Sequence, residues 1–453
     1  MTPAPRASAG LAGLRRELAA LGFTEARVQQ RFGLPASDDA LVAMQRPLLD
    51  FRGSGDGEAA LDVLVQLFIV GCAVPRPSFD RVLSAAGQAA LIDAALVELD
   101  AERACATAAI VPWRDLLVAS DRVDRMFAPD YVLFLNPCSA YLAPFIAPAG
   151  DEPRGHALDV GTGCGVLAML AARHHARVTA IDINPRAVAF AAFNAALNEL
   201  PLDAQLCAPD VLAEARFADI DLLMFNFPTM YQAHYISRSV AFRSELGEQL
   251  LRDGYGAAPR MLSATGRFLF THQSRVTPAG HLERLVASAG CTEQLGVVWI
   301  AGGPLTPIGY DGLEWGVAHG HRPGPGRRPP GFAVFPAPAG LSHVDRSDVD
   351  RFFASLEVVA AGGAALRGAV ASLPDGLAVT RTEHVRAGRM TAGAPVAGRE
   401  PLAAPDAELL RAIDGRATVA ALAADRGGDA AVDRIAALAR RGLIYLAITP
   451  SAR

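Results

Sequence analysis

The sequence contains no lysine, so all 42 of its basic residues are arginine. A phosphate-binding loop that depends on lysine, a Schiff-base lysine and a lysine general base are therefore excluded. Cysteine is also scarce. The six cysteines form no Cys-x-x-Cys pair and no Cys/His cluster with zinc spacing. We expect buried free thiols in a reducing compartment, and no metal site.

Long apolar runs and a strong positive charge are missing as well. The most apolar stretch, LDVLVQLFIVGCAV, is too short to span a bilayer and contains Asp62 and Gln66. Arg15, Arg16 and Glu17 stand where a signal peptide needs its apolar core, so the N-terminus is typical of an amphipathic helix. These features predict a cytoplasmic protein without a membrane partner. The net charge of −5 does not favour nucleic acid, although local basic patches leave that partner open.

The chain is long enough for several domains. Its 453 residues exceed one ordinary core, and 51% apolar with 20% charged residues is typical of a folded protein. Apolar residues at helical spacing predict a helical N-terminal domain over 1–125, with a texture that resembles a winged helix. Short apolar runs that alternate with helical patterns predict an α/β core with a parallel sheet over 126–340. A candidate hairpin, three short helices and a terminal strand predict a small α+β domain over 341–453, shaped like a winged helix.

The strongest local pattern is the stretch ALDVGTGCGVLAML. It predicts a strand over Ala157–Val160, followed by a turn at Gly161, Gly163 and Gly165 into a helix. Glycine suits such a turn because the backbone bends tightly and a ligand can approach without a Cβ in the way. Asp159 stands two residues before the first glycine, which gives the spacing D-x-G-x-G-x-G.

Two further carboxylates follow strand-like runs. Asp182 ends the run in VTAIDINP, and Asp210 follows the next run in LCAPDVL. A carboxylate at the second strand end can accept both hydroxyls of a ribose, and one at the third can accept from an adenine amine. Together with Asp159, these carboxylates would lie at the carboxyl edge where open α/β sheets bind ligands. A glycine-rich turn with solvated aspartates is the simpler alternative.

This combination resembles the class I S-adenosylmethionine (SAM) methyltransferases. The resemblance implies a Rossmann-like, doubly wound, seven-stranded sheet with SAM as cofactor, and its motifs cover about residues 110–275. By the same resemblance the glycine loop passes the methionine part of SAM, Asp159 helps to orient it, Asp182 holds the ribose and Asp210 the adenine. The implied cofactor residues are Asp159, Gly161, Thr162, Gly163, Gly165, Asp182, Ile183, Asp210, Val211, Asn226, Asn136 and Ser139.

Asn136 and Ser139 come from the stretch FLNPCSAYLAPFIAP, which precedes the first strand. In relatives, the corresponding helix lines the cofactor or substrate side of the cleft. A packing helix with a polar N-cap explains the same residues equally well.

The stretch DLLMFNFPTMYQ places Asn226 at the end of a fourth strand-like run. Asn-Phe-Pro-Thr stands where the branch that contains HemK and the small-subunit ribosomal-RNA guanine methyltransferases has Asn-Pro-Pro-(Phe/Tyr). The resemblance implies that the Asn226 side chain accepts from a substrate N–H and that the carbonyl of Phe227 accepts a second. Thr229 replaces the stacking ring of that motif, and Tyr231, Tyr235 or Phe227 could substitute for it. A simple turn cap at Asn226 remains the alternative.

These residues favour methyl transfer to a nitrogen of a small molecule or peptide. A second hypothesis is an enzyme for which SAM is itself the substrate, such as a cyclase that forms azetidine-2-carboxylate or an aminocarboxypropyl transferase, with release of methylthioadenosine. A third is a SAM-binding interaction protein without turnover. The outer domains are expected to form a lid, a homodimer interface or a partner surface.

Overall fold

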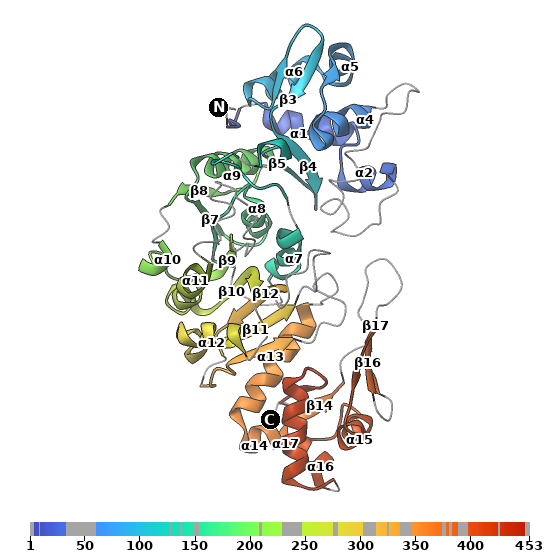
Figure 1. The fold of residues 1–453 in the computed structure, drawn as a ribbon, viewed down its shortest axis with the longest axis vertical. Helices are drawn as coiled ribbons and strands as arrows, with labels where there is room; N and C mark the ends of the chain where they lie inside the picture. Colours follow the sequence, from blue (N-terminus) through green and yellow to red (C-terminus); the bar gives the residue numbers. More distant parts are fainter. Residues whose placement is uncertain are drawn as a thin grey trace. The chain divides into compact units, whose positions relative to one another are not determined.

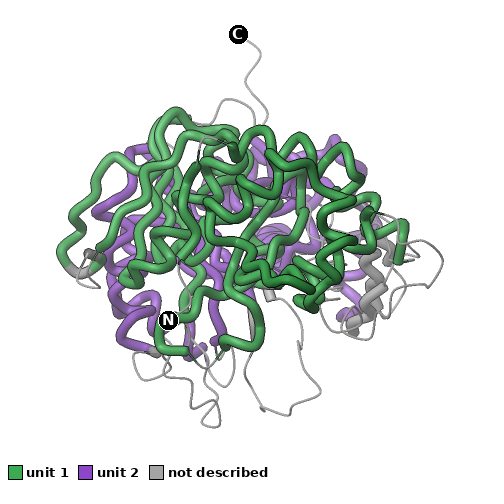
Figure 2. The backbone as a smooth tube through the Cα atoms, turned by 90° about the horizontal axis from the view of Figure 1, so that it is seen from above, with its two compact units in different colours: residues 1–247 green, residues 248–453 purple. Residues whose placement is uncertain are grey.

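The computed structural model describes most of the chain, and the contacts within it define two compact units. The described residues are 4–8, 10–32, 60–126, 128–135, 137–148, 154–207, 211–228, 247–274, 280–301, 314–323, 326–335, 346–373, 377–379, 383–387, 397–424 and 426–448. Unit 1 is residues 1–247 and unit 2 is residues 248–453 (Figure 2). The predicted domain boundaries near 125 and 340 stay predictions.

The first part of unit 1 mixes helices with short strands. Its elements are α1 (Leu11–Ala20), α2 (Glu25–Phe32), α4 (Ala60–Leu64), a π-helix (Val65–Val70), β1 (Val74–Pro75), α5 (Arg76–Val82), α6 (Ala85–Asp93), β2 (Val97–Leu99), β3 (Arg103–Ala106), β4 (Ala109–Trp113), β5 (Leu116–Ser120) and a 3-10 turn (Val123–Arg125). Strands β1, β3 and β2 form one sheet, and β4 pairs with β5 in an antiparallel hairpin. The helical prediction for this segment is therefore incomplete, and its winged-helix shape is not confirmed.

The second part of unit 1 is a parallel sheet with helices. It consists of α7 (Pro137–Ile146), β6 (His156–Val160), α8 (Val166–Ala172), β7 (Arg177–Asp182), α9 (Pro185–Leu197), β8 (Asp203–Leu206), α10 (Val211–Glu214) and β9 (Ile220–Asn226). The strand order is β9-β6-β7-β8, and every neighbouring pair is parallel. The alternation of strands and helices thus confirms the predicted α/β, Rossmann-like class of fold.

Helices α8 and α9 pack against this sheet, α8 on β6 and β7 and α9 on β7 and β8 (Figure 1). Strands β6 and β7 are mostly buried, as parallel strands next to helical layers are, whereas β8 is only partly covered. Asn184 begins α9 as its N-cap, with Oδ1 accepting from the backbone N–H of Arg186 at 3.0 Å. Pro185 follows at the first helical position, where its missing N–H costs nothing. The start of this helix, and so the end of β7, is set by local sequence.

Two buried asparagines, Asn194 in α9 and Asn198 at its C-cap, pair with the backbone of β5. Asn198 accepts from the N–H of Leu117 at 2.9 Å and donates to its carbonyl at 2.8 Å. Asn194 does the same with Ala119, at 2.8 and 2.7 Å, and donates to the carbonyl of Cys164 at 2.8 Å. These amides satisfy backbone groups that a neighbouring strand would otherwise pair. They join the β4–β5 hairpin to the residue before Gly165.

Unit 2 begins with a helix and a mixed set of strands. These elements are α11 (Gly247–Met261), β10 (Leu262–Ser274), α12 (His281–Ser288), a 3-10 turn (Cys291–Glu293), β11 (Gly296–Ala301), β12 (Glu314–His321) and β13 (Phe332–Phe335). The strand order is β13-β11-β12-β10. Strand β12 is antiparallel to both neighbours, whereas β11 and β13 are parallel. The apolar runs GRFLFTHQ, LGVVWIA and LEWGVAHG form β10, β11 and β12, as the predicted alternation implies, but a total of seven strands is not confirmed.

The rest of unit 2 is a helical cluster with short strands. It contains α13 (Arg346–Ala361), α14 (Gly363–Gly368), β14 (Val370–Ser372), β15 (Leu377–Val379), β16 (Glu383–Ala387), β17 (Ala397–Pro401), α15 (Ala404–Ala412), α16 (Val419–Ala424), α17 (Asp429–Arg440) and β18 (Tyr445–Ala447). Helices α13 to α17 share one apolar core, and β18 pairs with β14. The predicted hairpin proves to be three strands, β15 to β17. The three closing helices and terminal strand are confirmed, whereas the winged-helix shape stays a prediction.

The structure also bears on the state of the cysteines and on membrane-spanning helices. All six cysteines are free thiols, but only Cys138, Cys164 and Cys291 are buried, and Cys72 is exposed. None of the helices in the described part of the chain has the length and apolar character that a bilayer crossing requires.

Candidate functional site

The carboxyl ends of β6, β7 and β9 bring the predicted residues to one edge of the sheet. Val160, the last residue of β6, lies level with Ile181 of β7 and with Phe225 of β9. Gly161, Asp182 and Asn226 each come one residue later. Parallel strands end at the same edge, so the glycine loop, the carboxylate and the amide meet there.

The glycine loop is held by the neighbouring strand β7. The N–H of Thr162 donates to the carbonyl of Ile181 at 3.0 Å, and the N–H of Gly163 donates to Oδ2 of Asp182 at 2.9 Å. The N–H of Gly165 closes the turn by donating to the carbonyl of Thr162 at 2.8 Å. Thr162 is thus placed by its backbone, while its hydroxyl points inward to Asp159.

Gly163 and Gly165 have different roles in the loop. Both have positive φ, +55° at Gly163 and +82° at Gly165. A Cβ at Gly165 would lie 2.9 Å from Cα and Cβ of Ala191, so this glycine lets α8 and α9 pack closely. A Cβ at Gly163 would meet nothing within 4 Å. That open space is where a ligand can approach the loop.

Alanine at these two positions should therefore separate stability from binding. We expect Gly165→Ala to lower the free energy of unfolding by roughly 3 kcal/mol, through left-handed strain and overpacking against α9. Gly163→Ala should cost roughly 1 kcal/mol of strain and weaken SAM binding about tenfold, because its methyl enters the open space. Chemical unfolding and titration calorimetry measure the two effects. Wild-type SAM affinity in a folded Gly163→Ala variant would contradict the role given to that space.

Asp159 lies beneath the loop. Its side chain is 1% exposed, and Oδ2 accepts from the hydroxyl of Thr162 at 2.6 Å and from the N–H of Ala168 at 3.2 Å. Burial raises the pKa of this carboxyl to about 7, against the opposing effect of its two hydrogen bonds. In this structure Asp159 therefore holds the loop through Thr162 and the start of α8 through Ala168.

The raised pKa of Asp159 has a consequence for stability. The unfolded carboxyl titrates near 3.8 and the folded one near 7, so the folded state binds more protons between these values. Stability is therefore lost as pH rises through this window. Relative to Asp159→Asn, the wild type should lose roughly 3 kcal/mol of unfolding free energy between pH 5 and 8. Urea unfolding of both proteins across this range tests the prediction, and parallel curves would contradict it.

Asp182 ends β7 with both carboxylate oxygens turned to backbone N–H groups. Oδ2 accepts from Gly163 at 2.9 Å and Oδ1 accepts from Asn184 at 2.8 Å. Each oxygen has two lone pairs, so each can accept a further hydrogen bond from a ribose hydroxyl. Burial raises the pKa of Asp182, while these N–H groups act in the opposite direction. The predicted ribose carboxylate is thus placed at the loop.

Two large apolar side chains are exposed beside Asp182. Ile183 is 41% exposed and Leu206 is 63% exposed. Leu206 ends β8 and lies level with Asp182 in the pairing of β7 and β8. Apolar groups left in solvent at a ligand-binding edge offer contact area for a flat base. Ile183 is a predicted cofactor residue, but nothing in the sequence signals that Leu206 is exposed.

Asn226 ends β9 and is half-buried, and Pro228 beyond it is half-buried as well. Phe227, between them, is 2% exposed, and its ring stacks on Phe225 with centroids 3.8 Å apart and planes at 27°. The ring of Phe227 is therefore part of the core and offers no surface to a substrate in this structure. Its predicted role in catalysis rests on its backbone carbonyl.

The remaining predicted residues lie around this edge or outside the described chain. Ser139 is buried in α7, a helix that contacts α8 and β9, which fits the packing alternative for that residue. Val211 begins α10. Asn136, Asp210, Thr229 and Tyr231 lie outside the described residues.

A protein-family model matches the segment of the chain that contains this site. Residues 135–293 match the family model of the methyltransferase small domain. This range contains the glycine loop, Asp182 and Asn226, and SAM is the cofactor of such domains. The match supports the predicted SAM-dependent methyltransferase for this segment, whereas the HemK branch is not confirmed.

One similar protein and one similar solved structure are named as a methyltransferase or methylase of ribosomal protein L11. A ribosomal protein L11 methyltransferase of Symbiobacterium thermophilum is 34% identical over 123 residues, which are 27% of this chain. The chain spans 37% of the length of that relative. A ribosomal protein L11 methylase structure from Lactobacillus delbrueckii subsp. bulgaricus is 20% identical with a TM-score of 0.30, over 42% of this chain and 81% of that one. M. jannaschii TYW2 in complex with AdoMet is 16% identical with a TM-score of 0.31, over 48% of this chain and 87% of that one.

Proposed function

We propose that this protein transfers the methyl group of SAM to a nitrogen of a small molecule or peptide. The observation that carries the proposal is the position of Asn226, which ends β9 at the edge where the glycine loop and Asp182 also lie. An amide at this point can face both a cofactor held by the loop and a nucleophile that approaches it.

The residues present fit SAM. The open space at Gly163 admits the ligand to the loop, the free lone pairs of Asp182 suit two ribose hydroxyls, and Ile183 with Leu206 provides apolar contact for the base. SAM supplies an electrophilic methyl group on a sulfonium sulfur. The protein then needs to bind and orient, since a neutral nitrogen attacks with its lone pair and sheds its proton afterwards.

Asn226 and Phe227 would orient that nitrogen. The side-chain oxygen of Asn226 accepts from one substrate N–H, and the backbone carbonyl of Phe227 accepts from a second. These two acceptors direct the lone pair toward the methyl carbon, so catalysis is mostly positioning. No strong base is required for this transfer.

The surroundings of Asn226 favour a small amine or a peptide over a nucleobase. Threonine takes the place of the ring that stacks on a flat acceptor in the motif, and the ring of Phe227 is buried against Phe225. Flat acceptors depend on such stacking. The net charge of −5 also gives no general attraction for nucleic acid.

The test is incubation of the full chain with SAM, first alone and then with small amines, peptides and ribosomal protein L11, the acceptor in the name of one relative. Mass spectrometry follows the nucleoside products. S-Adenosylhomocysteine that forms only with an acceptor supports methyl transfer. Methylthioadenosine from SAM alone would overturn the proposal in favour of a cyclase or an aminocarboxypropyl transferase. SAM binding without any product would indicate a binding protein.

A further inference from the structure

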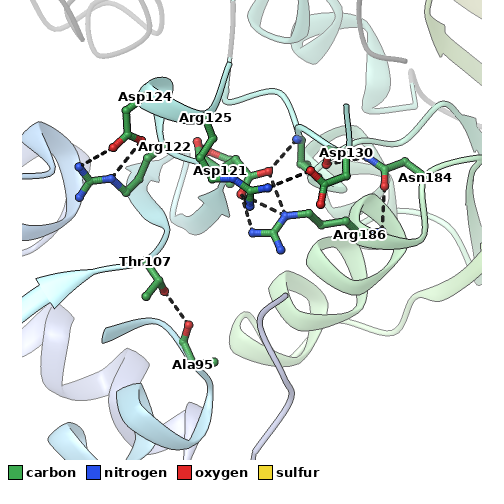
Figure 3. A network of polar contacts seen from close by, with 11 residues as sticks. Ala95, Thr107, Asp121, Arg122, Asp124, Arg125, Asp130, Asn184 and Arg186 are labelled. Carbon is green, nitrogen blue, oxygen red and sulfur yellow. Dashed lines mark hydrogen bonds and ion pairs between the residues drawn. The ribbon is translucent and has the colours of Figure 1, made fainter. Parts of the chain in front are cut away.

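A closed ring of polar contacts joins the turn after β7 to the segment that follows β5 (Figure 3). At its centre are Asp121, which is fully buried, and Arg186, which is 6% exposed. Nε of Arg186 lies 3.1 and 3.0 Å from the two carboxylate oxygens of Asp121, and Nη2 lies 2.6 Å from Oδ1. A fully buried ion pair with this geometry fixes α9 to the segment after β5.

Three more residues close the ring. Arg125 donates through Nη1 to Oδ1 of Asp121 at 3.1 Å and through Nη2 to Oδ1 of Asp130 at 2.8 Å. The backbone carbonyl of Asp130 accepts from Nδ2 of Asn184 at 3.0 Å. Oδ1 of Asn184 in turn accepts from the N–H of Arg186 at 3.0 Å, which returns the path to its start.

The ring reaches the cofactor edge through one residue. The backbone N–H of Asn184 donates to Oδ1 of Asp182 at 2.8 Å. The other oxygen of Asp182 accepts from Gly163 in the glycine loop. Oδ2 of Asp121 also accepts from the N–H of Val132 at 2.9 Å, so the same carboxylate orders the segment that leads into α7. The orientation of the Asp182 carboxylate therefore depends on the ion pair between Arg186 and Asp121, which lie 65 positions apart in the chain.

We propose that Asp121 is a positioning residue for cofactor binding: through Arg186, Arg125 and Asn184 it fixes the turn that presents Asp182 to the ribose. The inference rests on the proposed function, because it assigns Asp182 to SAM. Asp121 itself is buried and would not touch the ligand. Its loss should lower affinity for every ligand that carries the adenosine group, and by a similar factor for each.

Two variants open the ring in different places. Asp121→Asn keeps the shape of the side chain and removes its charge, which leaves two arginines without their buried carboxylate. Asn184→Ser opens a single contact, because serine still caps α9 but is too short to reach the carbonyl of Asp130. Both should raise the Kd for SAM and for S-adenosylhomocysteine about tenfold by titration calorimetry. If Asp121→Asn fails to fold, Asn184→Ser decides alone.

A double-mutant cycle separates positioning from general loss of structure. In an Asp182→Asn background, the effect of Asn184→Ser or Asp121→Asn on the Kd should shrink to less than about threefold, since the group being positioned is already altered. The matched control is Asp124→Asn, an exposed carboxylate of the same segment that pairs with Arg122 outside the ring. It should leave the Kd unchanged.

The outcomes distinguish this inference from the proposed function. A wild-type chain that binds neither SAM nor S-adenosylhomocysteine overturns both. A wild type that binds, with Asn184→Ser and folded Asp121→Asn at the same Kd, overturns the positioning role alone. The positioning role also fails if either substitution lowers affinity by an equal factor in the wild-type and Asp182→Asn backgrounds.

Discussion

Replacing Asn226 with alanine is expected to lower turnover at least about 100-fold while the Kd for SAM stays within about twofold. The side chain stands at the end of β9, where its oxygen can hold the acceptor nitrogen in line with the methyl group. Without it the acceptor binds in many orientations, and misplacement by about 1 Å costs rate on this scale. Steady-state kinetics with an acceptor that yields S-adenosylhomocysteine, together with calorimetry for SAM, measure the two quantities.

The control for this variant keeps the acceptor oxygen. The carboxylate of an Asn226→Asp variant still offers oxygen lone pairs to the substrate N–H, so turnover should fall only about tenfold. Turnover that survives in Asn226→Ala would remove the amide from the reaction. A large loss of SAM affinity in the same variant would instead assign Asn226 to the cofactor.

The ends of the core strands were predictable because the sequence gives two signals, an apolar run and the polar or small residue that follows it. Strand β6 is followed by a glycine, and β7 and β9 end at an aspartate and an asparagine after mostly apolar and buried residues. A polar or small residue after a buried run indicates where a parallel strand leaves the core. Asp182 and Asn226 could thus be placed at one edge without knowledge of any contact.

The burial of individual side chains and the contacts between residues far apart in the chain were not predictable in the same way. The resemblance suggests that Asp159 helps to orient the ligand, and the structure shows that its carboxylate is buried under the loop. Spacing gives the order of residues along the chain and not their distance from the surface, so this burial was not predictable. The ring around Asp121 joins residues 65 positions apart, so no local pattern indicates it. Strands β1 to β5 were missed because runs of two to five residues are too short for a period-2 pattern.

Replacing Asp182 with alanine is expected to weaken SAM binding by about 100-fold or more. Hydrogen bonds to a charged group contribute roughly 1.5–3 kcal/mol each, and the carboxylate can make two with a ribose. The variant also leaves the N–H of Gly163 without the oxygen that now holds it at 2.9 Å. Calorimetry with SAM and with S-adenosylhomocysteine should give the same loss, because the two ligands share the adenosine group.

Acid should weaken binding for the same reason. Burial raises the pKa of Asp182, so its carboxylate is protonated at a higher pH than an ordinary aspartate. Protonation removes the charge that strengthens the bonds to the ribose, and wild-type affinity should fall as pH drops toward this pKa. Asp182→Asn has no such titration and should show a flatter profile.

The control for Asp182→Ala is Asp203→Ala, which should bind SAM normally. Asp203 is an exposed carboxylate that begins β8, so it lies at the opposite end of the strands. An Asp182→Ala protein with wild-type affinity would mean that the ribose is held elsewhere.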